Sequence, residues 1–556
     1  MRWQVATTIS GTSSSERFEQ IIKTLLAQRG FKTPSQIADF KNPPSPEKIP
    51  FSAVKLDTRA IRKAVSRLKK AIADRQPIFV YGDYDADGIT ATAILWETLY
   101  TLGANALPFI PHREKHGYGL KKEGVDEILN RLPPNASQPL VVTVDNGIVA
   151  HQAVDYARQK GVEVIVTDHH QPSGRLPKAF SIVHTTQLSG AGVAWFFSRA
   201  LLAGDQPRLL SSLLELAAIG TVADMMPLVG ANRSLAKFGL QAIRRTQRVG
   251  LKAIFEEAGL TPETVDTYHI NFVIAPRLNA MGRLEDALDS LRLLCTPNPQ
   301  RATQLAKKLG ETNRQRQALT QKTLDHARGL HRPRRKLIFV AHPSYHQGII
   351  GLVAGKLVEE HHRPAIVVTK GEVFSKGSAR SIKGFDIIKA LRKFKHLFVD
   401  LGGHPMAAGF TIETQNLTRL QREITQLAEQ TLTKKDLTPT LKIDCQIELS
   451  DVTSQLYRAV QQFAPFGLGN PRPVFCSRQV RLAYAKAVGN DFQHLKLQFY
   501  QKPSGPTGLI DAIGFGLGHL IDQLHLDQPL DIAYTIDENT FNHHTTLQLK
   551  IKDLKF

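Results

Sequence analysis

Three carboxylates alternate along the segment 82–88, which reads GDYDADG, at Asp83, Asp85 and Asp87. A short apolar run, 78–81, precedes the segment and a helix-like run follows it, so the order is strand, acidic loop, helix. Ligands of open α/β sheets bind just beyond the carboxyl ends of the strands. Like charges this close repel one another unless a cation lies between them. The pattern favours a divalent metal site over a solvated turn, for which Asp and Gly are also suited.

Further acidic side chains follow apolar runs later in the chain. Asp145 comes directly after the run 140–144, and the triplet 168–170 (Asp-His-His) comes after the run 162–167. Asp224 also follows an apolar run. Each alone has a plainer explanation, an Asp that caps the next helix or a histidine satisfied in the core. Together they are predicted to meet at one edge of a parallel sheet, which indicates a common site.

The predicted ligand set consists of carboxylates with one or two imidazoles. Carboxylate oxygens suit Mg²⁺ and Mn²⁺, and an imidazole favours Mn²⁺ somewhat. One carboxylate shared by two ions is the usual way to hold a metal pair, and Asp145 is well placed for that sharing. Such a pair clamps a phosphoryl group, activates water and stabilises the leaving oxygen. The residues therefore point to phosphoester hydrolysis.

Alternating strand and helix patterns must position these residues. Short apolar runs separated by helical patterns predict βαβ units and a parallel sheet covered on both faces. The predicted strands are 78–81, 106–110, 140–144 and 162–167, and the predicted helices between and after them are 89–102, 122–131 and 148–160. A second α/β region begins with the run 336–340, and after about 438 a period of two predicts a small antiparallel β domain, for which an OB-like barrel is one form.

We therefore expect an α/β fold class with two α/β domains and a C-terminal OB-like β-barrel. A long polar helical stretch, 284–330, is interpreted as a helix that connects the two α/β domains, with a surface helix of the first domain as the alternative. The expected parts are an N-terminal segment 1–50, a catalytic domain 51–283, a connecting helix 284–335, a second α/β domain 336–435, and a linker with a nucleic-acid-binding barrel 436–556.

Composition restricts the partners and the compartment. The chain has 556 residues, a formal net charge of +21 and a pI of about 9.8. Such an excess of positive charge suggests nucleic acid as a partner, although a generally basic proteome would give the same number. The three cysteines are far apart and odd in number, which fits a reducing compartment. No signal peptide or membrane-spanning run stands out, so we expect a cytoplasmic protein without a membrane partner.

Several motifs together resemble one family. The segments 82–88 (GDYDADG), 144–147 (VDNG) and 168–170 (DHH) resemble the signature of the DHH phosphoesterase superfamily. Further matches are 111–113 (PHR), 117–120 (GYGL), 222–228 (VADMMPL), 275–283 (APRLNAMGR), 348–351 (GIIG), 377–381 (GSARS), 402–409 (GGHPMAAG, similar to DHHA1) and 465–471 (PFGLGNP). The set resembles the RecJ family of single-strand-specific 5′→3′ DNA exonucleases, over most of the chain from about residue 50.

That resemblance implies roles for the acidic and histidine residues. Asp85 and Asp145 would hold one metal ion, with Asp83 in support. The other ion would be held by Asp87, Asp145, His169 and Asp224. The resemblance further implies Asp168 as the carboxylate behind the histidines and His170 as the group that faces the scissile phosphate. Asp145, Asp168 and His170 are thus the expected catalytic residues, and two Mn²⁺ or Mg²⁺ ions the expected cofactors.

The resemblance also implies how the 5′ end of the substrate is seated. Arg113, Ser378 and Arg380 match positions that bind the terminal phosphate, for which an arginine fork is suited. The other substrate-binding residues expected from the matching motifs are Arg277, Arg283, Gly402, Gly403 and His404. In the β domain, Phe499 and Tyr500 are candidate stacking residues, with the alternative that at least one of them belongs to the core.

The expected function is metal-dependent degradation of single-stranded DNA from its 5′ end to mononucleotides, in DNA repair and recombination. Alternatives are a phosphodiesterase for short oligonucleotides or cyclic dinucleotides, a small-molecule pyrophosphatase, and a degenerate DNA-binding scaffold. The extra β domain and the charge favour a polymer, and no proposed ligand is missing. The resemblance implies a monomer that works with a single-strand-binding protein and a helicase.

Overall fold

The structure, a computed structural model, describes residues 1–556 except 12, 114, 134–135, 331–334, 502–507 and 542–543. The contacts divide these residues into two compact units. The larger unit contains residues 50–224 and 238–439, and the smaller unit contains residues 1–49, 225–237 and 440–556. Among the helices in this described part of the chain, none is long and apolar enough to span a bilayer.

The larger unit contains a five-stranded parallel sheet with the order β3-β2-β4-β5-β6. Its strands are β2 (Ile78–Tyr81), β3 (Ala106–Phe109), β4 (Leu140–Val144), β5 (Glu163–Asp168) and β6 (Ser181–His184). Every residue of β2 and β4 is buried, as expected for central strands covered on both faces. The parallel sheet predicted from the sequence is therefore confirmed. The edge strand β6 escaped prediction because it is short and only half-buried.

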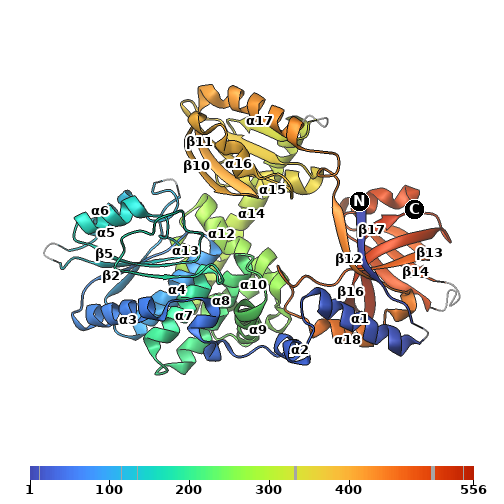
Figure 1. Cartoon of the computed structure of the whole chain (residues 1–556), viewed down its shortest axis with the longest axis horizontal. Coiled ribbons are helices and arrows are strands. Elements are labelled where there is room, and N and C mark those ends of the chain that lie inside the picture. Colours follow the sequence, from blue (N-terminus) through green and yellow to red (C-terminus); the bar gives the residue numbers. More distant parts are fainter. Residues whose placement is uncertain (12, 114, 134–135, 331–334, 502–507, 542–543) are drawn as a thin grey trace. The chain divides into compact units, whose positions relative to one another are not determined.

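Helices cover both faces of this sheet (Figure 1). Helices α5 (Lys122–Asn130) and α6 (His151–Gln159) pack on one face, where Phe79, Val141 and Val166 form part of an apolar cluster. The other face is covered by α3 (Thr58–Ala73), α4 (Ala86–Thr101) and α7 (Gly190–Leu202). Further helices of the unit are α8 (Pro207–Ala223), α9 (Gly230–Ile243, which begins in the smaller unit), α10 (Val249–Ala258), α11 (Thr267–His269), the π-turn η4 (Ile270–Ile274) and α12 (Ala275–Leu284).

The long helical stretch predicted over 284–330 is two helices. Helix α13 spans Leu288–Cys295 and α14 spans Pro299–Leu330. The break falls at prolines 297 and 299, which cannot donate the hydrogen bonds of a continuous helix. Helix α14 also buries one face rather than being polar all round, through small and apolar residues such as Ala302, Ala306 and Leu309.

A second five-stranded sheet follows α14 in the chain, with the order β10-β11-β9-β8-β7. Its strands are β7 (Ile338–His342), β8 (Ala365–Thr369), β9 (Phe374–Arg380), β10 (Phe398–His404) and β11 (Ala407–Glu413). The helices of this region are α15 (Ile350–His361), α16 (Ile387–Arg392) and α17 (Leu417–Thr431). Only β7 and β8 pair in parallel, and the remaining pairs are antiparallel.

The smaller unit is built around a closed β-barrel. Its strands are β13 (Phe475–Val488), β14 (His494–Tyr500), β15 (Ile510–Gly514), β16 (Pro529–Phe541) and β17 (His544–Lys555). The order β13-β14-β15-β17-β16 closes by pairing of β13 with β16, which is the five-stranded barrel of an OB fold. Phe499 is fully buried in its core, so the interpretation of this ring as a core residue is confirmed.

The N-terminal segment belongs to this smaller unit. Strand β1 (Arg2–Thr8) pairs in parallel with β12 (Thr440–Gln446), and α1 (Ser14–Gln28) and α2 (Pro34–Lys41) pack on the core shared with α18 (Ser454–Gln461). Arg233, 2% exposed, donates to the carbonyls of Phe40, Phe463 and Ala464. One buried guanidinium thereby ties the N-terminal helices to the loop before the barrel.

Candidate active site

The first acidic segment connects β2 to α4. Asp83 follows the strand and is 1% exposed, whereas Asp85 is exposed and caps the helix by accepting from the Gly88 N–H at 2.9 Å. Helix α4 begins at Ala86, three residues earlier than predicted, so Asp87 lies in its first turn. The strand sequence and the capping aspartate thus give two buried carboxylates and one exposed carboxylate around a helix N-terminus.

Asp145 directly follows β4 and adopts a left-handed backbone conformation, with φ of 62°. Few non-glycine residues adopt it outside functional sites and turns. The neighbouring Asn146 donates to the Gly82 carbonyl at 3.1 Å and to the Val144 carbonyl at 2.9 Å. These bonds join the ends of β2 and β4, so the two acidic segments are fixed relative to each other.

Asp87 is held by the N-terminus of α7. Its carboxylate accepts from the N–H groups of Gly190 at 2.7 Å and Ala191 at 2.9 Å, where the helix dipole favours a negative charge. A Cβ on Gly190 would lie 2.5 Å from Asp145 Oδ1, so a glycine is required for α7 to approach the acids this closely.

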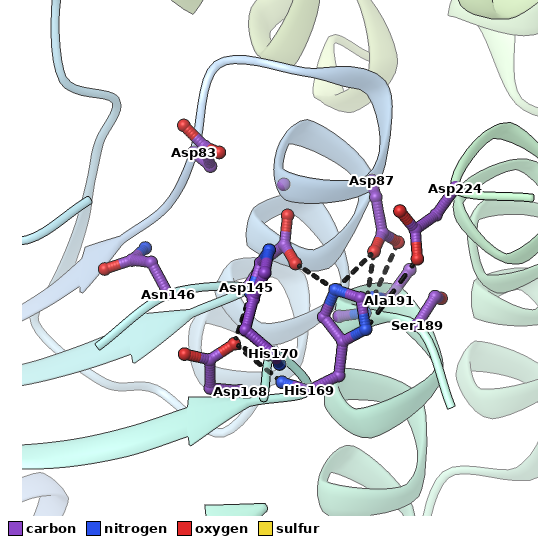
Figure 2. Close-up of polar contacts among 12 residues, drawn as sticks. Asp83, Asp87, Asp145, Asn146, Asp168, His169, His170, Ser189, Ala191 and Asp224 are labelled. Carbon is purple, nitrogen blue, oxygen red and sulfur yellow. Dashed lines mark hydrogen bonds and ion pairs between the residues drawn. The ribbon is translucent and has the colours of Figure 1, made fainter. Parts of the chain in front are cut away.

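His169 lies at the centre of the carboxylates (Figure 2). Its Nε2 is 3.0 Å from Asp145 Oδ1 and 3.8 Å from Asp87 Oδ2, and its Nδ1 is 3.7 Å from Asp224 Oδ2. Asp224 caps the C-terminus of helix α8, so the apolar run that precedes this residue is a helix and not a strand of the sheet. The helix nevertheless delivers the carboxylate to the same place.

The structure brings the predicted ligands together in three groups that could each hold a metal ion. The groups are Asp83, Asp85 and Asp145; Asp87, His169 and Asp224; and Asp145, His169 and His170, with ligand atoms within 4.8 Å of one another in each. Asp145 belongs to two groups, and its buried Oδ1 accepts no hydrogen bond from the residues that the structure describes. A buried oxygen left in this way fits a cation. The donor set therefore suits two Mg²⁺ or Mn²⁺ ions that share Asp145.

The electrostatics of the cluster also fit cations. Burial and the neighbouring Asp85 raise the pKa of Asp83 to about 8 and that of Asp87 to about 6. Burial and the field of Asp87 raise the pKa of Asp224 to about 8, and burial with the field of Asp87 raises that of Asp145 well above its usual range. Positive charge between these groups would remove the repulsion that raises the values.

His170 has a different environment from its neighbour. Its Nδ1 lies 2.8 Å from Asp168 Oδ1, and Asp168 also accepts from the N–H of Ile148 at 2.8 Å. Burial alone would lower the pKa of His170, but the hydrogen bond to Asp168 raises it to about 9. Burial lowers the pKa of His169 to about 4. The pair thus provides one neutral imidazole suited to a metal and one imidazolium suited to a phosphate.

A group of arginines adjoins the acids. Burial and the charges of Arg113 and Arg316 lower the pKa of Arg283 to about 10, and Arg380 contributes in the same direction. The buried Nε of Arg113 has no hydrogen-bond partner among the described residues. Arg283 Nη1 donates to the Gly348 carbonyl at 3.1 Å. Guanidinium groups that raise one another's energy in this way favour a bound anion.

The first turn of α15 borders the same arginines. A Cβ on Gly351 would lie 3.0 Å from Arg380 Nη2 and 3.1 Å from Ser378 Oγ. Arg380 Nη1 in turn donates to Ser378 Oγ at 3.1 Å. A helix N-terminus with its free N–H groups next to arginines is suited to a phosphate.

Other residues implied as substrate contacts have different surroundings. Arg277 donates to Glu257 Oε2 at 2.7 Å and to the Val273 carbonyl at 2.9 Å, so its guanidinium is engaged within the fold. His404 is exposed as a whole residue. Partial burial of its ring and the nearby charge of Arg380 lower the pKa of His404. A Cβ on Gly402 would meet open space, whereas one on Gly403 would lie 2.3 Å from the Ala407 carbonyl oxygen. Gly403 is therefore required by the β10–β11 hairpin itself.

Several residues at the site had no role in the sequence analysis. Asn279 Oδ1 accepts from the Ala86 N–H at 2.7 Å and so fixes the first turn of α4. His184 Nε2 lies 2.7 Å from the His170 carbonyl oxygen, and Arg316 joins the arginines. Tyr118 Oη lies 2.9 Å from His170 Nε2. Asn279 and Tyr118 stand in motifs quoted for the family resemblance, which was the one available signal.

Comparisons with known proteins agree with this architecture. Profiles described as DHH family, N-terminal domain, as DHHA1 domain and as RecJ OB domain match residues 77–221, 335–430 and 443–553. The single-stranded-DNA-specific exonuclease RecJ of Bacillus subtilis (strain 168) is 33% identical over 582 residues, which cover 100% of this chain and 70% of the relative. RecJ of Escherichia coli (strain K12) is 33% identical over 528 residues, 89% of this chain and 90% of the relative.

A solved structure gives the same result. The crystal structure of RecJ in complex with Mn²⁺ from Thermus thermophilus matches with a TM-score of 0.84 at 30% sequence identity. The match covers 100% of this chain and 79% of the other. A second structure of the same protein, in complex with Mg²⁺, matches with a TM-score of 0.77.

Proposed function

The chain belongs to the RecJ family of single-stranded-DNA-specific exonucleases, and from this membership we propose that it degrades single-stranded DNA from the 5′ end to mononucleotides. The enzyme is a metal-dependent phosphodiester hydrolase that uses Mn²⁺ or Mg²⁺. The observation that carries the proposal is the convergence of Asp85, Asp87, Asp145, His169 and Asp224 in overlapping groups that could each hold a metal ion, next to a group of arginines that suits a terminal phosphate.

The catalytic residues divide the chemistry between them. Divalent ions held by the carboxylates and His169 supply the activation of water and the neutralisation of charge that phosphodiester hydrolysis needs. His170, kept protonated by Asp168, faces the scissile phosphate, and its positive charge stabilises the negative charge that grows there. Asn146 and the N-terminus of α7 hold the strand ends and Asp87 in place, so little reorganisation accompanies the reaction.

Direction follows from where the terminal phosphate is seated. Arg113, Arg283 and Arg380, with Ser378 and the first turn of α15, bind the 5′-phosphate. His404, Gly402 and Gly403 border the strand beyond that seat. The engagement of Arg277 with Glu257 supports a positioning role, in which Arg277 orients α12 and does not touch the DNA itself. Recognition of the end then fixes which phosphodiester lies over the metal site.

The domains act together on a polymer. We assign the catalytic domain to 51–283, the connecting helices to 284–335, the second α/β domain to 336–435 and the nucleic-acid-binding barrel to 436–556. The segment 1–50 completes the barrel's unit, which its strand β1 supports. A protein with a net charge of +21 suits an anionic polymer, and a role in DNA repair and recombination follows from the need to remove single strands there.

Partners beyond the DNA form a finer part of the proposal. A nuclease restricted to single strands needs a supply of them, so we propose a helicase and a single-strand-binding protein as partners, and the cytoplasm as the compartment. We further propose that the enzyme is a monomer, because one chain carries both the metal ligands and the arginines. Light scattering of the purified chain tests this, and a dimer mass would contradict it.

One digestion series tests the proposed activity. Oligonucleotides, single- or double-stranded and labelled at either end, are incubated with the full chain and Mn²⁺. We expect mononucleotides to appear first from the 5′ end of the single strand, with the duplex resistant. A 5′-phosphorylated single strand that stays intact would refute the proposal. The variant Asp87→Ala should be inactive by at least about a hundredfold, because the ion held between Asp87, His169 and Asp224 is lost.

A further inference from the structure

Tyr118 stands beside the active site on a loop anchored to the core. The residue lies between two glycines in left-handed conformations, Gly117 with φ of 74° and Gly119 with φ of 69°. The buried Tyr81 hydroxyl donates to the Gly119 carbonyl at 3.1 Å, and Leu120 is 2% exposed. The tyrosine therefore stands on a turn whose backbone is fixed to the core.

The hydroxyl of Tyr118 is one of two anchors of the His170 ring. It lies 2.9 Å from Nε2, and Asp168 Oδ1 lies 2.8 Å from Nδ1 on the other side of the ring. An imidazole bonded at both nitrogens has a defined orientation. Tyr118 thereby contributes to orienting the imidazole that faces the scissile phosphate in the proposed function.

The ring of Tyr118 belongs to a row of side chains that begins at an arginine. Arg113 Cζ lies 4.4 Å from the centroid of the Tyr84 ring. The Tyr84 and Tyr118 centroids are 6.3 Å apart with the planes at 75°, and the Tyr118 and His170 centroids are 6.0 Å apart at 79°. Tyr118 is 46% exposed, so its ring has surface left for a ligand.

The two ends of this row bind successive phosphates in the proposed function, on which the present inference rests. Arg113 binds the 5′-phosphate and His170 faces the scissile phosphate, so the rings between them face the sugar and base of one nucleotide. We propose that Tyr118 seats the 5′-terminal nucleotide, with its ring stacked on the terminal base and its hydroxyl holding His170 against the scissile phosphate.

In this proposal Tyr118 has two functions, which are to stack on the terminal base and to orient His170. Stacking on an aromatic ring accepts every base, because each has a π-face, as an enzyme that digests any sequence requires. The hydroxyl connects occupancy of the seat to the catalytic imidazole, because both contacts come from one rigid side chain. In this arrangement one terminal nucleotide lies between Arg113 and His170, as release of mononucleotides requires.

Two substitutions separate the ring from the hydroxyl. The full-length variants Tyr118→Phe and Tyr118→Ala are assayed with Mn²⁺ on a 5′-phosphorylated single-stranded oligonucleotide. Tyr118→Phe should lower kcat by about tenfold and leave KM unchanged, because His170 loses an anchor while the ring remains. Tyr118→Ala should in addition raise KM by about tenfold, as expected for one lost stacking contact. An unchanged kcat in the first overturns the role of the hydroxyl, and an unchanged KM in the second overturns the role of the ring.

A substrate without the terminal base provides the decisive measurement. An oligonucleotide with an abasic 5′-terminal nucleotide should raise KM about tenfold for the wild-type chain and should cause no further increase for Tyr118→Ala, since the stacking partner is already gone. A full abasic penalty in that variant would overturn the inference, because the base would then be bound elsewhere.

A matched control guards against general effects of removing a surface tyrosine. Tyr100, 66% exposed at the end of α4 and stacked on Trp96 at 5.3 Å, is changed to Ala. Tyr100→Ala should keep wild-type kcat and KM on both substrates. A wild-type chain that fails to digest the ordinary oligonucleotide refutes the proposed function, whereas an active wild type with an unaltered Tyr118→Ala refutes this inference alone.

Discussion

Asp145, a proposed metal ligand, has three features that suit a cation. Its backbone is left-handed, its side chain is 2% exposed and its Oδ1 accepts no hydrogen bond from the described residues. Each of these features raises the free energy of the metal-free fold. A cation coordinated by this oxygen offsets that cost, so binding of the metal and stability of the fold are linked.

Substitution of Asp145 should therefore reduce the increase in stability that the metal produces. For the wild type, Mn²⁺ at a free concentration 100 times its Kd should add about 2.7 kcal/mol to the free energy of unfolding, seen as a rise in Tm. Asp145→Asn should abolish most of that rise, because an amide binds divalent cations weakly. Asp155→Asn, on the exposed side of α6 and paired with Arg158, is the control and should keep it. An undiminished rise in Asp145→Asn would contradict the shared-ligand assignment.

The same measurement has a predicted pH dependence. The pKa values of Asp83 and Asp224, both about 8, lie above those of the unfolded chain, so the metal-free fold binds more protons than the unfolded state. Its stability should fall as pH rises from about 4 towards 8. Mn²⁺ competes with these protons, so the Mn²⁺-induced rise in Tm should be larger at pH 8 than at pH 6. A rise independent of pH would show that the carboxylates are ionised without metal.

Residue types and spacing predicted part of this site. Asp83, Asp145 and Asp168 follow short apolar runs. A buried strand followed by an acidic residue can be recognised from the amino-acid sequence alone. Asp224 lies at the end of a helix, and the sequence pattern of a helix differs from that of a strand. Only the three-dimensional structure shows where the side chain of Asp224 points. Tyr118 reaches His170 across 52 residues of chain, a pairing that no local spacing encodes.

At the scale of elements, one half-buried carboxylate holds three helices together. Glu257 of α10 accepts from Arg277 Nε of α12 at 2.7 Å and from Arg314 Nη1 of α14 at 2.8 Å. Helix α12 also carries Asn279, which fixes the first turn of α4. The first turn of α4, which contains Asp87, is thus linked through Asn279 and α12 to the contacts of Glu257.

Removal of the charge from Glu257 should affect stability in a pH-dependent way. Burial alone would raise the pKa of Glu257, but hydrogen bonds from Arg277 and Arg314 lower it below its usual value. The stabilisation is therefore fully present above the unfolded pKa of about 4.3 and is lost as pH falls through the folded value. Glu257→Gln should have a lower Tm than the wild type at pH 7, and the difference should shrink below about pH 4. A difference that stays constant to pH 3 would mean that packing, not charge, is responsible.

At the scale of the whole molecule, the sequence predicted which kinds of domain are present better than it predicted which segments of the chain belong to each domain. Periods of two and of 3.6 are local, so the two α/β regions and the β-barrel were visible. Pairing between distant strands is not local, and β1 joins β12 across more than 400 residues. The amphipathic patterns of α1 and α2 indicate which face of each helix is buried, but they do not indicate which part of the protein that face packs against. The N-terminal segment therefore gave no sign that it completes the unit of the barrel.

One feature of the barrel depends on which residues lie opposite each other in neighbouring strands. Lys486 of β13 lies directly opposite Lys496 of β14, and the row continues through Ile513 of β15 to Lys550 of β17. Lys550 pairs with Asp537, whereas neither Lys486 nor Lys496 makes an ion pair with a residue that the structure describes. Like charges placed opposite each other destabilise a sheet by a few tenths of a kcal/mol or more. Their juxtaposition on an exposed face suits an anionic strand laid across the barrel.

A salt titration of DNA binding tests whether this face contacts the DNA. Each phosphate contact on a single strand contributes about 0.7 to the slope of log K against log salt, so Lys486→Gln with Lys496→Gln should reduce that slope by about 1.4. The same double change should leave Tm unchanged or slightly raised, because it relieves repulsion. The control, Lys69→Gln with Lys70→Gln on exposed positions of α3, removes equal charge and should leave the slope intact. Equal slopes for both variants would mean that net charge alone, rather than this face of the barrel, attracts the DNA.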